Sequence, residues 1–226
     1  MNQHELENAM RFYILATQLK YKIRSGWDNK HWNVKGRRES VAEHVYGTCI
    51  LAIAIASEFH SDIDLEKVIK MLVLHEIGEV IIGDITPFDD VTPEEKLRRE
   101  HAAIIDIVGD LIAKDEIISL LFEFDEHKTK ESIFAYHCDK FDAVAQSKIY
   151  QDMKRHWPLK DRHGNVSKSQ GNNVAFNYPQ IHEIIEAGAE TPFDVWYEAD
   201  KEKFADDEVF MQMLEYLKNI NTQELQ

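Results

Sequence analysis

The feature that most constrains this fold is the scarcity of chain breakers between long stretches of helical periodicity. The chain has 226 residues but only 9 glycines and 5 prolines. Between them, apolar residues recur every three or four positions, which places them on one face of a helix. We therefore expect an all-α protein, a bundle of about six to eight helices.

Start and stop signals divide the expected helices. Ser40 with Glu43 fits a capping box, Gly83 fits a helix end, and Pro93 followed by two glutamates fits a helix start. The expected helices cover about residues 6–20, 40–59, 65–82, 93–108, 116–124, 130–156, 179–187 and 206–219.

The length favours one large domain, because a second complete core would be cramped in a chain of this size. We expect a single domain over residues 1–226, with its core at about residues 5–155. Turn-forming residues are densest at 158–174, which we expect to be a mobile loop. A helical C-terminal extension follows at 175–226.

Charge and cysteine content limit the binding partners and the cellular compartment that we expect. With 26 Lys and Arg against 41 Asp and Glu, the formal net charge is −15, which repels nucleic acids and anionic membranes. No apolar run approaches the roughly 20 residues of a membrane span, and the N-terminus lacks a secretory pattern. The 2 cysteines offer no disulfide framework. We expect a cytoplasmic protein without nucleic-acid or membrane partners.

Ionisable residues interrupt helix faces that should be apolar. In the segment 65–82, His75, Glu76 and Glu79 lie at helical spacing with valine, leucine and isoleucine. Carboxylates are rarely buried unless they are paired or bound to a metal. Asp84 follows just after this segment, where the helix dipole disfavours negative charge, so stability alone does not explain these acids.

His44 and Asp139 repeat this pattern on two other expected helices. Two histidines and two carboxylates on three helices form a ligand set for a divalent cation. Taken singly, His44 can be a hydrogen-bonded core residue, and Glu76 can be an ion-pair partner between helices.

In chain order, these residues resemble the motif of the HD-domain metal-dependent phosphohydrolases, an all-helical superfamily. His44, His75-Glu76 and Asp139 match its H…HD…D pattern, with glutamate in place of the aspartate. The match to the 5'-deoxynucleotidase branch covers about residues 5–155. It rests on Arg24 to Trp27, Glu39 to His44, His75 to Glu79, Gly83 to Pro87, and Asp139-Lys140 with Gln146 and Tyr150.

The resemblance implies a set of roles. One divalent ion, whether Mn, Co, Ni, Fe, Zn or Mg, would be held by His44, His75, Glu76 and Asp139. Glu79 and Asp84 would be the catalytic acids, Arg24 would bind phosphate, and Trp27 would pack on the base or sugar. The sequence leaves Arg37 and Arg38 open as alternatives to Arg24, and it leaves open that Trp27 only anchors its loop.

The implied activity is hydrolysis of 2'-deoxyribonucleoside 5'-monophosphates, small-molecule nucleotides, by a homodimer. Lys35, Arg37 and Arg38 keep a triphosphate or another phosphoester open as substrate. The cyclic-dinucleotide branch carries lysine where this chain has Glu79. A catalytically silent scaffold that binds metal or nucleotide is the alternative from another class, but Glu79 and Asp84 favour an enzyme.

Overall fold

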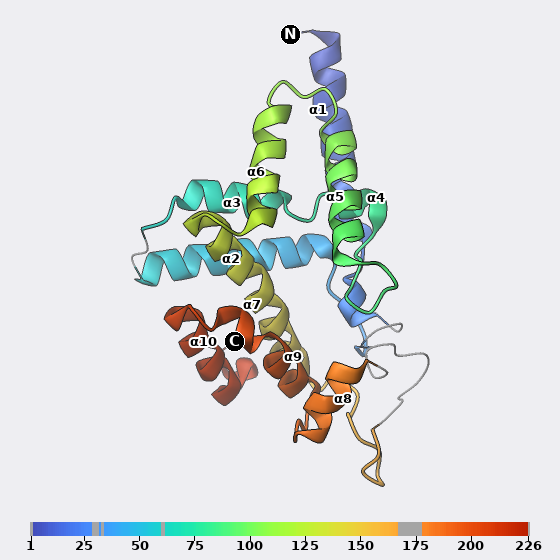
Figure 1. Ribbon diagram of the computed structural model, residues 1–226, viewed down its shortest axis with the longest axis vertical. Coiled ribbons are helices and arrows are strands. Elements are labelled where there is room, and N and C mark those ends of the chain that lie inside the picture. The colour runs from blue at the N-terminus through green and yellow to red at the C-terminus, as the bar shows by residue number, and fades with distance from the viewer. Residues whose placement is uncertain (1, 29–31, 33, 60–61, 167–177, 226) are drawn as a thin grey trace. The chain divides into compact units, whose positions relative to one another are not determined.

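The computed structural model describes residues 2–28, 32, 34–59, 62–166 and 178–225 (Figure 1). These residues form the helices α1 to α10, and the β-structure among them is confined to two isolated bridges. The all-helical prediction is confirmed. The chain divides into two compact units, described separately below: unit 1, Met1–Ile23 with Ser40–Asp139, and unit 2, Arg24–Glu39 with Lys140–Gln226. The single domain over 1–226 stays a prediction.

Most of the helices lie close to the expected segments; α7 ends at Asp152, earlier than expected, and two larger differences are described below. Unit 1 contains α1 (Gln3–Ala16), α2 (Val41–Phe59), α3 (Leu65–Leu74), α4 (Glu79–Ile82), α5 (Pro93–Val108) and α6 (Lys114–Glu126). The long helix α7 (Lys130–Asp152) begins in unit 1 and ends in unit 2. Unit 2 also contains α8 (Pro179–Glu186), α9 (Pro192–Asp200) and α10 (Glu208–Asn219).

The core of unit 1 lies where α5 and α6 meet the turn between α3 and α4. Its central residues are Ile77, Ile104, Ile107, Val108 and Leu121. Helix α1 runs beside α5, and α3 runs beside α2 (Figure 1). Each buried side chain of this kind contributes roughly 1.5–3 kcal/mol of transfer free energy.

The capping box at the start of α2 forms as predicted. The Ser40 amide donates to the Glu43 carboxylate at 2.8 Å, and the Glu43 amide donates to the Ser40 hydroxyl at 3.2 Å. This exchange satisfies two amides that the helix cannot bond internally. It fixes the first turn of α2, which carries His44.

The helix expected over 65–82 is interrupted, which corrects the prediction. Helix α3 ends at Leu74, tight turns occupy residues 75–78, and α4 follows. The reason lies in packing: a Cβ at Gly78 would lie 3.3 Å from the Glu100 carbonyl oxygen of α5. Glycine allows this close approach and also weakens a helix.

Helix α1 has two apolar faces. Phe12 and Leu15 pack against the core cluster, whereas Leu6, Met10 and Tyr13 are 40%, 53% and 57% exposed. A surface helix ordinarily has a polar outer face.

Helix α2 corrects the expectation that no apolar run approaches a membrane span. It has 19 residues and is long and apolar enough to cross a bilayer, by length and composition only, and 33% of its most apolar window is buried. Core helices of soluble proteins meet the same criteria, and α2 packs along α3.

Helix α9 was not predicted, although the sequence carries its signal. Thr191 and Asp194 form a capping box around Pro192. The loop expected at 158–174 begins with a turn, in which Asp161 accepts hydrogen bonds from the amides of His163 and Asn165. Residues 167–174 lie outside the described part of the chain.

Candidate metal centre

The structure brings the four predicted metal ligands together within unit 1. His44 comes from α2, His75 and Glu76 from the turn after α3, and Asp139 from α7. Their ligand atoms all lie within 4.8 Å of one another. His44 Nε2 is 3.0 Å from Asp139 Oδ1 and 3.6 Å from Glu76 Oε1.

Burial makes this arrangement costly without a cation. The His44 side chain is fully buried, and Asp139 is only 5% exposed. Two carboxylates placed this close together repel each other in a low-dielectric site. A divalent ion among them would neutralise that repulsion.

The His75 ring is oriented to offer a lone pair to the cluster. Its Nδ1 lies 2.7 Å from the Leu72 carbonyl oxygen, which can only accept, so we assign the proton to Nδ1. Nε2 therefore carries the lone pair, and it is buried without a hydrogen bond to the described residues. It lies 3.6 Å from Glu76 Oε1 and 3.7 Å from Asp139 Oδ1. A carboxylate cannot donate to this nitrogen, whereas a metal ion can accept its lone pair.

Glu76 reaches the cluster despite replacing the usual aspartate. Its Oε1 lies 3.6 Å from Nε2 of both His44 and His75. Two imidazoles with two carboxylates suit a borderline or hard divalent ion. The residues present therefore fit a divalent ion.

The predicted catalytic acids bracket α4. Glu79 begins this helix and is 2% exposed, and its amide donates to the Glu76 carbonyl at 3.0 Å. Asp84 follows Gly83, whose φ of 80° turns the chain after the helix. Glu79 therefore lies in the same local turn as two of the ligands, and both catalytic roles stay predictions.

Two further acids in this region were missed by sequence reasoning. Burial raises the pKa of Glu100 on α5, the Lys96 charge opposes this, and the Glu76 charge adds to it. Burial also raises the pKa of Asp125 on α6, opposed by a 2.7 Å hydrogen bond with His101. Their only sequence signal is an acid at helical spacing with apolar residues.

The predicted phosphate-binding loop belongs to unit 2. Arg24 is half-buried and precedes the 3-10 turn Ser25–Trp27, while Arg37 is exposed and Arg38 half-buried. Trp27 is 2% exposed, and its indole N–H donates to Glu39 Oε2 at 2.9 Å. These contacts are those of a loop anchor, and a direct substrate contact by Trp27 stays a prediction.

Aromatic side chains enclose Trp27. Its ring centroid lies 5.3 Å from that of Tyr150 and 4.8 Å from that of Trp196. The 4 tryptophans of the chain, Trp27, Trp32, Trp157 and Trp196, all belong to unit 2.

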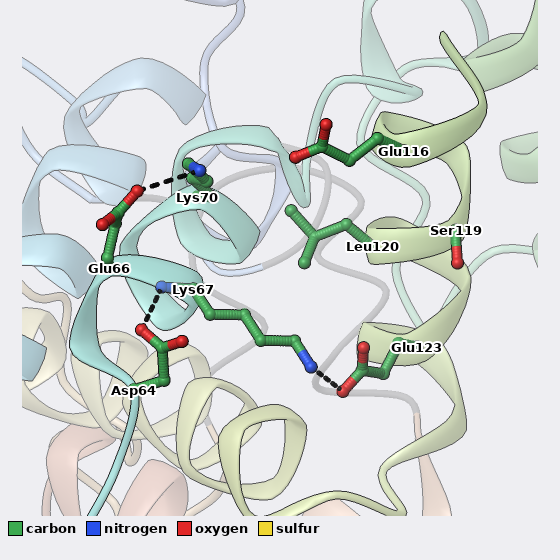
Figure 2. A pocket seen from close by; sticks show the side chains of 8 residues that line it. All are labelled: Asp64, Glu66, Lys67, Lys70, Glu116, Ser119, Leu120 and Glu123. Carbon is green, nitrogen blue, oxygen red and sulfur yellow. Dashed lines mark hydrogen bonds and ion pairs between the residues drawn. The ribbon is translucent and has the colours of Figure 1, made fainter. Parts of the chain in front are cut away.

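A separate pocket opens between α3 and α6 (Figure 2). Lys67 and Lys70 line it, but Lys67 pairs with Glu123 at 2.6 Å and Lys70 with Glu66 at 3.0 Å. Leu120 of α6 points toward α3 between the charged groups (Figure 2). Because both lysines are neutralised by carboxylates, the pocket lacks the positive charge that a phosphate group needs.

Comparison with known proteins agrees with this geometry. The HD domain family matches residues 16–182, more than half of the chain. A 5'-deoxynucleotidase HDDC2 from Dictyostelium discoideum is 34% identical over 65% of this chain and 79% of its own length. The Homo sapiens 5'-deoxynucleotidase HDDC2 is 29% identical over 80% of this chain and 85% of its own.

Among solved structures, the PH0347 protein from Pyrococcus horikoshii OT3 has the same fold, with a TM-score of 0.59. It is 20% identical and covers 92% of this chain and 99% of its own. With a matching family, a matching fold and the family's ligand pattern gathered at one point, the chain belongs to the HD domain family.

Proposed function

We propose that this protein is a metal-dependent phosphohydrolase that cleaves 2'-deoxyribonucleoside 5'-monophosphates to deoxynucleoside and phosphate. The observation that carries the proposal is the cluster of His44, His75, Glu76 and Asp139, with His75 Nε2 aimed into it. Relatives of 34% and 29% identity bear the name 5'-deoxynucleotidase, which supports the choice of substrate.

The reaction needs a nucleophilic water, neutralisation of the phosphate oxygens and a proton for the leaving oxygen. A bound divalent cation lowers the pKa of its water and withdraws charge from the phosphate. His44 and His75 would hold it through nitrogen, and Glu76 and Asp139 through oxygen. These four side chains would leave the ion accessible to water and phosphate.

Glu79 and Asp84 are the acids that we assign to proton transfer. One proton leaves the attacking water as its oxygen bonds to phosphorus, and one reaches the 5'-oxygen as its bond to phosphorus breaks. A carboxylate can take the first proton, and a carboxylic acid can give the second. Glu79 is buried, and its amide donates to the Glu76 carbonyl at 3.0 Å, which supports this assignment.

Arg24 is the group that we assign to the phosphate oxygens. A guanidinium can donate two parallel hydrogen bonds to a phosphate, a geometry that lysine cannot match. We assign the preference for deoxynucleotides to packing around the 2' position of the sugar.

The test is phosphate release by chelator-stripped protein reloaded separately with manganese, cobalt, nickel, iron, zinc and magnesium. Substrates are deoxy- and ribonucleoside 5'-monophosphates and deoxynucleoside triphosphates, and Glu76→Ala is the control. Metal-dependent turnover of deoxynucleoside monophosphates that Glu76→Ala abolishes is the expected result. Metal binding without turnover would support the silent scaffold, and faster turnover of triphosphates would move the assignment to that substrate.

We also propose that the protein is a homodimer that binds one ion per chain. The resemblance to the 5'-deoxynucleotidases supports the dimer, as does the exposed apolar stripe of Leu6, Met10, Tyr13 and Ile14 on α1. Light scattering after gel filtration measures the mass, and Tyr13→Glu should dissociate the dimer. A monomer at every concentration contradicts this proposal, and elemental analysis gives the number of ions.

We propose the cytoplasm as the site of action, supported by the two free cysteines, Cys49 and Cys138. Fractionation of cells tests this, and recovery in the membrane or secreted fraction would contradict it.

A further inference from the structure

We infer that Glu39 and Trp27 are positioning residues that hold Arg24 in place for the substrate phosphate, an inference that rests on the proposed function. Three hydrogen bonds join these residues in a closed ring. The Arg24 amide donates to the Glu39 carbonyl at 3.0 Å, and the Trp27 amide donates to the Arg24 carbonyl at 3.0 Å. The ring closes where the Trp27 indole donates to Glu39 Oε2 at 2.9 Å.

The ring uses both main-chain polar groups of Arg24. Its backbone is therefore fixed on both sides, with φ of −56° and ψ of 121° at the start of the 3-10 turn. Fixing the backbone in advance reduces the entropy that binding must otherwise remove.

The ring is attached to helix α7. The Tyr150 hydroxyl, on the last part of α7, accepts a hydrogen bond from the Glu39 amide at 2.9 Å. Trp27, Glu39 and Tyr150 are 2%, 8% and 2% exposed, so water does not compete for these bonds. A loop held by buried hydrogen bonds on a helix positions a functional group more accurately than a free loop does.

Glu39 makes three of the hydrogen bonds that hold the ring in place. Its carbonyl, its amide and its carboxylate contact three different residues: Arg24, Tyr150 and Trp27. A buried carboxylate is costly unless it is hydrogen-bonded, so a purely structural loop would gain from an apolar residue here. The hydrogen bonds of Glu39 order the chain around Arg24.

This inference differs from direct packing of Trp27 on the substrate base. The buried indole would act through Arg24, so its loss would weaken binding of any phosphate, including inorganic phosphate. Direct packing on the base would instead affect nucleotides and leave inorganic phosphate unchanged.

The experiment compares Glu39→Ala, Glu39→Gln and Trp27→Phe with wild type in the metal-loaded full chain. It measures kcat and KM for a deoxynucleoside 5'-monophosphate, the inhibition constant of inorganic phosphate, and metal content. Arg24→Ala is the reference for complete loss of the phosphate contact. Glu186→Ala, at an exposed glutamate ending α8, is the matched control.

We expect Glu39→Ala and Trp27→Phe to raise both KM and the phosphate inhibition constant about tenfold, the loss typical of one buried hydrogen bond to a charged group. In Trp27→Phe, which leaves every carboxylate and histidine in place, we expect metal content to stay unchanged and kcat to change by less than about threefold. Glu39→Gln should restore both constants to within about threefold of wild type, since its amide oxygen still accepts from the Trp27 indole. The double variant Glu39→Ala with Trp27→Phe should be no worse than either single variant.

Three outcomes would overturn the inference. They are an unchanged KM in Glu39→Ala, a Glu39→Gln variant as weak as Glu39→Ala, and a Trp27→Phe effect on nucleotides without one on phosphate. If Glu39→Ala fails to fold, Glu39→Gln and Trp27→Phe still decide the question. Absence of wild-type turnover would refute the proposed function, and calorimetric binding of inorganic phosphate to the same variants would still test the ring.

Discussion

The metal centre of unit 1 and the Arg24 loop of unit 2 are built on opposite principles. The metal centre gathers mutually repelling carboxylates and a lone pair on His75 Nε2 with no hydrogen bond to the described residues. The loop joins Arg24, Trp27 and Glu39 in a ring of hydrogen bonds. The candidate metal centre is suited to a ligand but lowers the stability of the fold. The hydrogen bonds of the Arg24 loop add stability and hold the backbone of Arg24 in place. Substitutions in the two regions should therefore have different consequences.

The largest expected effect is at Glu76. Glu76→Gln keeps the size of the side chain but removes the charge that holds the cation, so we expect turnover to fall by about a thousandfold or more. The melting temperature of the metal-free variant should equal or exceed that of metal-free wild type, because one of two repelling carboxylates is gone. Calorimetry with and without chelator measures this. A metal-free variant that is clearly less stable would mean that the charges stabilise the fold.

The next effect concerns Glu79. We expect Glu79→Ala to lower kcat by about a hundredfold to ten-thousandfold while metal content stays intact, since general acid–base groups contribute this much. Steady-state kinetics with elemental analysis checks the result. Full turnover with intact metal would remove Glu79 from the mechanism.

Acidification should destabilise unit 2 through His156. Burial lowers the pKa of His156 to about 4, and the charges of Arg155 and Lys35 add to this. Between pH 6.5 and 4, His156 is protonated in the unfolded chain but neutral in the folded one. Its contribution to the free energy of unfolding is therefore fully present above pH 6.5 and is lost as the pH falls toward 4. The shift corresponds to about 3 kcal/mol.

Denaturant unfolding at pH 7 and pH 4.5 measures this loss. We expect His156→Gln to reduce the pH dependence of the free energy of unfolding, whereas His163→Gln, at an exposed histidine, should leave it unchanged. Equal pH dependence in wild type and His156→Gln would show that His156 is not the group responsible.

The smallest expected effect is at the start of α2. Glu43→Ala removes half of the capping box and should lower the free energy of unfolding by about 1 kcal/mol. Glu58→Ala, near the other end of the same helix, should have no such effect, because a negative charge there opposes the helix dipole. Thermal unfolding distinguishes the two, and equal destabilisation would assign the effect to helix propensity alone.

The clustering of the four candidate ligands could be predicted from sequence because these residues violate a strong rule. His44, His75, Glu76 and Asp139 interrupt apolar helix faces, and the structure brings all four together. The interruption between α3 and α4 could not be predicted, because it depends on how closely α5 approaches Gly78. Periodicity describes one helix at a time and contains nothing about its neighbours.

The hydrogen-bonded ring around Arg24 was also beyond sequence reasoning. Glu39 and Tyr150 were recognised as part of a motif, but their partners lie 12 residues and 111 residues away in the chain. Helix α9 differs, because its start is encoded locally: Thr191 and Asp194 form a capping box around Pro192.

Because all 4 tryptophans lie in unit 2, two spectroscopic signals can follow the unfolding of the two units separately. Indole emission comes from unit 2 alone, since unit 1 contains tyrosine and phenylalanine but none of the 4 tryptophans. Tryptophan emission therefore reports on the unfolding of unit 2, whereas far-ultraviolet circular dichroism reports on the helices of both units. Two transitions that coincide would mean that the units unfold together, and two that separate would give each unit its own stability.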